Sequence, residues 1–127
     1  MSGTASADEI RHLVQTIDDN ADILHADLTP SVQQLTRLGL PAAQAVLPLL
    51  NDPKQLTRMR AFVVLGNIVM QHHGWQAGRG YARPDQEDAV TALMHANGDY
   101  SVTAPPEERE QAIAQWRQWL EQELANA

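Results

Sequence analysis

The residues best suited to bind a metal ion or to move protons in this chain are its histidines, and His72 and His73 form an adjacent pair. Motifs that place two ligands on one face of a helix use His-x-x-x-His spacing, whereas neighbouring residues point in different directions. His95 could join the pair only if the fold brought it near. The spacing therefore predicts no metal site, and we expect ordinary loop histidines.

Carboxylates gather at two places in the sequence, namely at Asp18 and Asp19 and at Asp85, Glu87 and Asp88. Such groups act as general acid and base only in a concave site that excludes water. At the start of a helix they serve more simply as caps and as partners of the positive helix end. Ser101 and Thr103 have no histidine at a motif spacing, so a nucleophilic triad has no support. We expect no catalytic, cofactor-binding or metal-ligating residues and no cofactor, and the sequence favours a protein that is not an enzyme.

The most unusual composition lies in residues 71–83, where three glycines predict an irregular loop. Gly78-Arg79-Gly80 does not form a phosphate loop, because no strand precedes it and no Gly-Lys-Ser/Thr follows it. Arginine and aromatic side chains carry much of the binding energy of protein interfaces. The candidate partner-binding residues are His73, Trp75, Arg79, Tyr81 and Arg83.

The same loop has a purely structural interpretation, in which Trp75 and Tyr81 fold inward and hold it on the helices. Arg79 lies between two glycines that offer little cover, so we expect it to be exposed. We expect Trp75 to be at least half buried.

Length and composition indicate one domain spanning residues 1–127, of which residues 1–5 are expected to be frayed. The formal net charge of −7 disfavours binding to nucleic acid or to an anionic membrane and favours a basic partner. The absence of cysteine excludes disulfides and thiolate chemistry. The sequence has no secretory-signal pattern and no bilayer-length apolar run, so we expect a cytoplasmic protein.

Helical periodicity and capping signals predict an all-α fold of about six helices. Ser6 and Glu9 have capping-box spacing, and the pattern that follows weakens after Asp18, leaving open whether Ile23 and Leu24 continue the first helix. The other expected helices run from Thr29-Pro30 to Gly39, from Ala42 to Leu50 with an irregular turn at Pro48, from Pro53 to Met70, from Asp85 to His95, and from Thr103–Pro106 to Leu124.

The helix expected from Pro53 should lie at the centre of the domain. Pro53 suits a first helical turn, and Asp52 can accept hydrogen bonds from the free N–H groups there. The run after Arg60 is almost entirely apolar, which is typical of a helix buried on most sides. We expect Leu65, within this run, to be fully buried.

Residues 52–66 resemble the turn and second helix of a HEAT repeat, and the matching residues are Asp52, Pro53, Arg58, Ala61, Leu65 and Gly66. The resemblance implies stacked antiparallel hairpins and an ion pair between Arg58 and an Asp of the turn. The glycine and aromatic pattern from Gly74 to Leu120 is also similar to that of short bacterial HEAT-like proteins, which implies no known activity.

The sequence therefore favours a non-catalytic module that binds another protein, since helical repeat stacks present extended surfaces. A narrower hypothesis is a small acidic inhibitor of the immunity or antitoxin kind that binds a basic toxin. The alternative is a small-ligand-binding protein or an enzyme that uses residues 72–83, with His73, Arg79 and Tyr81 around an anionic compound. The oligomeric state is left open.

Overall fold

A computed structural model describes residues 6–126, and it contains helices and loops with no strand in that part of the chain. The all-α prediction with six helices is confirmed. The helices are α1 (Ala7–Gln15), α2 (Pro30–Leu38), α3 (Leu40–Val46), α4 (Gln55–His72), α5 (Pro84–Ala96) and α6 (Pro106–Ala125), with a short 3₁₀ helix, η1 (Leu47–Asn51), after α3. The predicted fraying of residues 1–5 concerns residues outside the described range.

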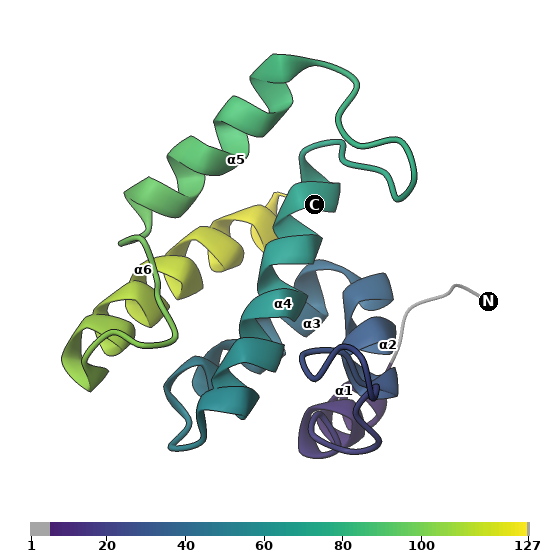
Figure 1. The fold of residues 1–127 in the computed structure, drawn as a ribbon. Coiled ribbons are helices and arrows are strands. Elements are labelled where there is room, and N and C mark those ends of the chain that lie inside the picture. Colours follow the sequence, from purple (N-terminus) through teal and green to yellow (C-terminus); the bar gives the residue numbers. More distant parts are fainter. Residues whose placement is uncertain (1–5, 127) are drawn as a thin grey trace.

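Helix α4 lies at the centre of the molecule, as predicted (Figure 1), and α6 packs on α3 and η1. Helix α4 packs against α2, α3, η1 and α5. Leu65 has no exposed surface, which confirms its expected position in the core. Trp116 and Leu120 of α6 are also fully buried in this core.

Local signals account for most of the helix ends. The hydroxyls of Ser6 and Thr29 accept hydrogen bonds from the backbone N–H groups of Glu9 and Val32, both 3.1 Å long, so both residues are N-caps. Gly39 separates α2 from α3 with a φ of 81°, a backbone conformation that favours glycine. Pro48 lies where α3 gives way to η1, because its ring cannot continue an α-helix.

Two of the sequence-based boundaries were wrong, and a third that was left open is now settled. Helix α4 begins at Gln55, so Pro53 lies outside its first turn. It continues through His72, so the irregular loop begins at His73 and not at residue 71. Ile23 and Leu24 do not continue α1; they belong to the connection of residues 16–29 between α1 and α2.

Three arginines are buried to more than nine-tenths, and each donates to the backbone carbonyl of a non-helical segment. Arg58 donates to the carbonyls of Asp52, Pro53 and Val102. Arg60 donates to Ala26 O, and Arg109 donates to Ala104 O. These hydrogen bonds fix the connections between the helices.

Asp52 does not cap α4, as the sequence suggested it could, because the N-cap residue is Lys54 and no side chain caps this helix. Asp52 and Arg58 are in contact, but not through the ion pair implied by the HEAT resemblance. Arg58 Nη1 lies 2.7 Å from the backbone oxygen of Asp52, while the Asp52 carboxylate accepts from the Lys54 N–H at 3.0 Å. The arginine therefore binds the main chain of the turn, whichever side chain residue 52 carries.

Replacing Arg58 should accordingly destabilise the protein more than replacing Asp52 does. Arg58→Ala removes three hydrogen bonds from a charged donor, each worth about 1.5–3 kcal/mol, and we expect a loss above about 2 kcal/mol. Asp52→Ala leaves the accepting carbonyl in place and removes one exposed hydrogen bond, so it should cost about 1 kcal/mol or less. Urea unfolding of both variants measures the difference, and equal losses would contradict the main-chain role.

Candidate functional site

The connection of residues 73–83, which we call the arginine loop, is closed by backbone hydrogen bonds. The Gln76 N–H donates to Gly80 O at 3.0 Å, and the Gly80 N–H donates to Gln76 O at 2.8 Å. Gly78 and Gly80 have φ values of 80° and 71°, which explains why glycine stands on both sides of Arg79. The loop therefore has a defined conformation.

The predicted side chains of the arginine loop divide into exposed and buried ones. Arg79 is exposed and Trp75 is more than half buried, as expected. Tyr81 packs against the hydrophobic core and helps to hold the loop in place. Arg83 is largely exposed, and its Nε lies 3.1 Å from a carboxylate oxygen of Asp85.

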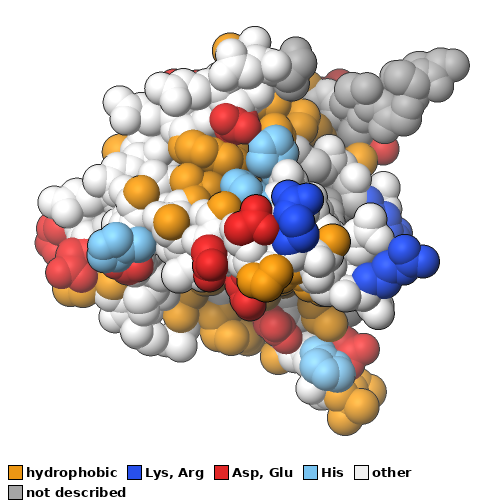
Figure 2. All heavy atoms as spheres, turned by 90° about the horizontal axis from the view of Figure 1, so that it is seen from above, with side chains coloured by type: hydrophobic (Ala, Val, Ile, Leu, Met, Phe, Trp, Pro, Cys, Tyr) orange, Lys and Arg blue, Asp and Glu red, His pale blue; other side chains and the backbone are white. Residues whose placement is uncertain are grey.

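His73 is the first residue of the arginine loop, but its side chain does not lie with the exposed arginines, because its ring packs on α6. Its Nδ1 lies 2.9 Å from Val69 O, and the ring is stacked on Trp119 with an interplanar angle of 17°. His72 Nε2 lies 2.8 Å from the carboxylate of Glu123. Figure 2 looks onto this end of the molecule and shows histidines set among hydrophobic side chains. The structure therefore places His73 in a helix–helix contact.

A hollow of about 380 Å³ lies where the arginine loop approaches α2 and α4. From the loop, Ala77 lines it, whereas His73, Arg79 and Tyr81 do not. The opposite wall includes Arg37 and Gln71. This geometry does not support the alternative in which those three loop side chains surround an anionic compound.

A second exposed feature, which the sequence did not predict, lies in the connection between α1 and α2. Ile23 is 99 % exposed and Leu24 is 84 % exposed, and they are the most exposed large hydrophobic residues of the described chain. We call this pair the aliphatic tip and residues 16–29 the tip loop. Single exposed apolar residues are ordinary on protein surfaces, but two adjacent ones with almost no cover are not.

Hydrogen bonds hold the tip loop in a defined shape. Asp22 Oδ1 accepts from the backbone N–H groups of Leu24 and His25, at 2.8 and 3.1 Å. The Leu24 hydrogen bond is the main cause that lowers the pKa of Asp22. The Asp22 N–H donates to Leu28 O at 3.0 Å, closing the loop behind the tip. Asp22 could have identified this turn from sequence, because aspartate often bonds to the backbone two residues ahead.

The base of the tip loop is fixed by α4. Arg60 donates to Ala26 O at 2.9 Å and to an Asp18 carboxylate oxygen at 2.6 Å. The other oxygen of Asp18 accepts from the Thr57 hydroxyl at 2.7 Å. Asp18, considered above as an acid–base candidate, is therefore a structural residue that ties the loop to the central helix.

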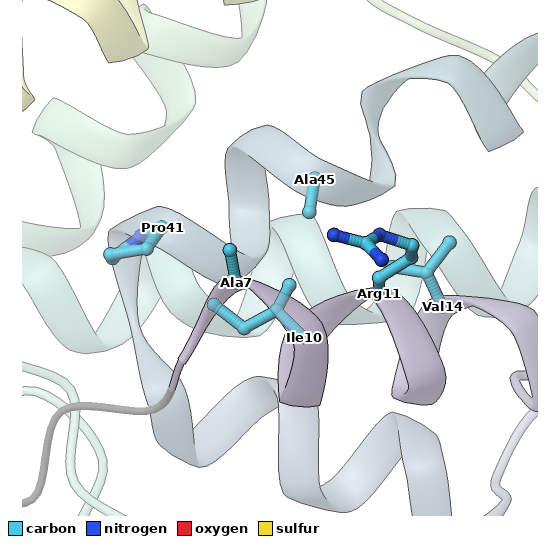
Figure 3. A pocket seen from close by; sticks show the side chains of 6 residues that line it. All are labelled: Ala7, Ile10, Arg11, Val14, Pro41 and Ala45. Carbon is cyan, nitrogen blue, oxygen red and sulfur yellow. The ribbon is translucent and has the colours of Figure 1, made fainter.

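A shallow apolar groove of about 310 Å³ lies between α1 and α3 (Figure 3). Its lining residues are Ala7, Ile10, Arg11, Val14, Pro41 and Ala45. Arg11 extends along the groove and also pairs with Asp8 at 2.8 Å. The lining is otherwise aliphatic, which suits contact with an apolar group and offers no acid–base pair.

The remaining chemical candidates lie in local contacts at the surface. Ser101 Oγ contacts Thr103 Oγ1 at 3.1 Å, and His95 Nδ1 lies 2.8 Å from Asp99 in a largely exposed pair. Within residues 6–126, no three histidine, aspartate or glutamate side chains are grouped so that they could hold a metal ion.

No protein-family model, curated protein or solved structure matches the chain. None of the helices in residues 6–126 is long and apolar enough to cross a bilayer.

The Asp18 contacts predict a loss of stability in acid. Burial opposes ionisation of Asp18, but hydrogen bonds from Arg60 and Thr57 outweigh it and hold its pKa below the ordinary 3.8. A carboxyl whose pKa is lower when folded adds stability above its unfolded pKa and loses it as the pH falls. We expect the free energy of unfolding to decrease below about pH 4, and to decrease less in Asp18→Asn. Denaturant melts of the wild type and of Asp18→Asn from about pH 6 to pH 2 measure this. The same decrease of the free energy of unfolding with pH in both proteins would contradict it.

Arg79 and Tyr81 should differ in their effect on stability, although both lie in the arginine loop. Arg79→Ala should change the free energy of unfolding by less than about 0.5 kcal/mol, because the side chain is exposed. Tyr81→Ala should cost at least about 1 kcal/mol, because its ring packs against the core. Thermal and urea melts provide the comparison. A large loss in Arg79→Ala would instead assign Arg79 a structural role.

Proposed function

We propose that this protein is a non-catalytic module that binds another protein, and that the aliphatic tip is its main point of contact. The observation that carries the proposal is the nearly complete exposure of Ile23 and Leu24 on a hydrogen-bonded loop. Exposing large aliphatic side chains to water is unfavourable unless a partner covers them. Because the loop is already ordered, binding requires little further loss of conformational freedom.

The helix arrangement supports a scaffold role. We propose that the α3–η1–α4 segment is a HEAT-like hairpin, supported by its turn at Asp52, the inward Arg58 and the buried Leu65. The narrower hypothesis of a small acidic inhibitor in the cytoplasm is supported by size and by the net charge of −7. Charge of this sign favours association with a basic protein.

The arginine loop is a second candidate for partner contact. The observation in its favour is the exposure of Arg79 on a closed loop held by Tyr81. Arginine is enriched among the residues that dominate interface energetics, so Arg79→Ala tests this surface independently of the tip.

The double substitution Ile23→Ser and Leu24→Ser tests the main proposal. Both side chains are exposed, so the free energy of unfolding should stay within about 0.5 kcal/mol of wild type. Affinity capture with tagged wild-type protein in cells of the native organism should retain a protein that the double variant loses, as quantified by mass spectrometry.

Leu56→Ser is the matched control, because Leu56 is a large hydrophobic residue of α4 that is 41 % exposed and lies outside the tip loop. It should capture the same proteins as the wild type. Equal capture by the double variant and the wild type would remove the tip from the binding surface and leave Arg79 as the residue to test.

A further inference from the structure

The aliphatic tip is set in an acidic surrounding. Residues 16–29 contain four aspartates and no lysine or arginine. Asp18 is engaged by Arg60, whereas Asp19 and Asp27 make no ion pair with the described residues. Besides Arg60, the cationic groups near the loop are Lys54, whose Nζ lies 3.7 Å from Asp18, and His25, whose Nδ1 lies 3.6 Å from Asp22 and is charged only when protonated. The tip therefore presents two aliphatic side chains on a loop with an excess of negative charge, in which Asp19 is exposed and Asp27 is partly exposed.

This combination restricts what can cover the tip. An anionic lipid surface or a second copy of a chain with a net charge of −7 meets repulsion from the same aspartates. A flat apolar surface leaves the aspartates desolvated without partners, which is costly. An apolar pocket with cationic groups around its entrance would cover the two aliphatic side chains and also pair with the aspartates of the tip loop.

We propose that the tip inserts into an apolar pocket rimmed by lysine or arginine on a partner protein. This inference rests on the proposed function and specifies the chemistry of the partner. Ile23 and Leu24 fill the pocket and set the lifetime of the complex, because apolar burial is lost only on dissociation. Asp19 and Asp27 meet the cationic rim and set the rate of encounter, since charges around an interface steer association.

The experiment begins with a photo-crosslinking residue, p-benzoylphenylalanine, in place of Leu24 in the full chain, expressed in the native organism. The crosslinked protein is identified by mass spectrometry, purified, and used as the probe in stopped-flow or surface-based binding kinetics. Three forms are compared with wild type. They are the neutralised pair Asp19→Asn with Asp27→Asn, the tip pair Ile23→Ser with Leu24→Ser, and a control pair Asp88→Asn with Glu121→Gln on exposed sites of α5 and α6.

We expect the neutralised pair to lower the association rate about 10-fold at low salt and to reduce its salt dependence, with the dissociation rate unchanged. The tip pair should raise the dissociation rate at least about 100-fold, and the control pair should match wild type. Asp22 is left intact in every form, because its carboxylate holds the loop.

The outcomes separate this inference from the proposal on which it rests. If the tip pair weakens binding and the neutralised pair binds as wild type or more tightly, protein binding stands and the cationic rim is refuted. If the Leu24 position crosslinks only to lipid, only to a second copy of the chain, or to nothing, both the partner chemistry and the proposed binding through the tip are refuted.

Discussion

The arrangement of this molecule depends on the need to solvate three buried guanidinium groups. Arg58, Arg60 and Arg109 are each more than nine-tenths buried, and a buried cation without hydrogen-bond acceptors is strongly destabilising. Backbone carbonyls of the connecting segments provide many of those acceptors. A carbonyl can serve only if the segment that carries it follows one path, so the arginines determine the course of the chain between the helices. The tip loop is one result, since Arg60 fixes Ala26 just behind the aliphatic pair.

The helices were predictable because their signals are local. Ser6, Thr29 and Gly39 mark helix ends through chemistry within a few residues, and the apolar run around Leu65 identifies the central helix through its pattern alone. The start of α4 was misplaced because Pro53 tolerates a turn as readily as a first helical position.

The candidate site was only partly predictable, because its decisive contacts join residues far apart in sequence. Exposure of Arg79 followed from its flanking glycines, which is a local argument. The stacking of His73 on Trp119 and the bond from Arg60 to Ala26 have no local signal. Because the sequence does not reveal the Arg60 contact, only the helical spacing could be used to place Ile23 and Leu24. That spacing left open whether they continue α1.

The attachment of α5 has a consequence for how the molecule opens. Among the described elements α5 packs only on α4, and Val90 is its single buried residue. At its far end, Asn97 Nδ2 is buried without a hydrogen-bond partner among residues 6–126. Few contacts and incomplete hydrogen bonding characterise the segments that unfold first in native proteins. We therefore expect α5 to detach and reattach more readily than the other helices, while the arginine-braced remainder stays folded.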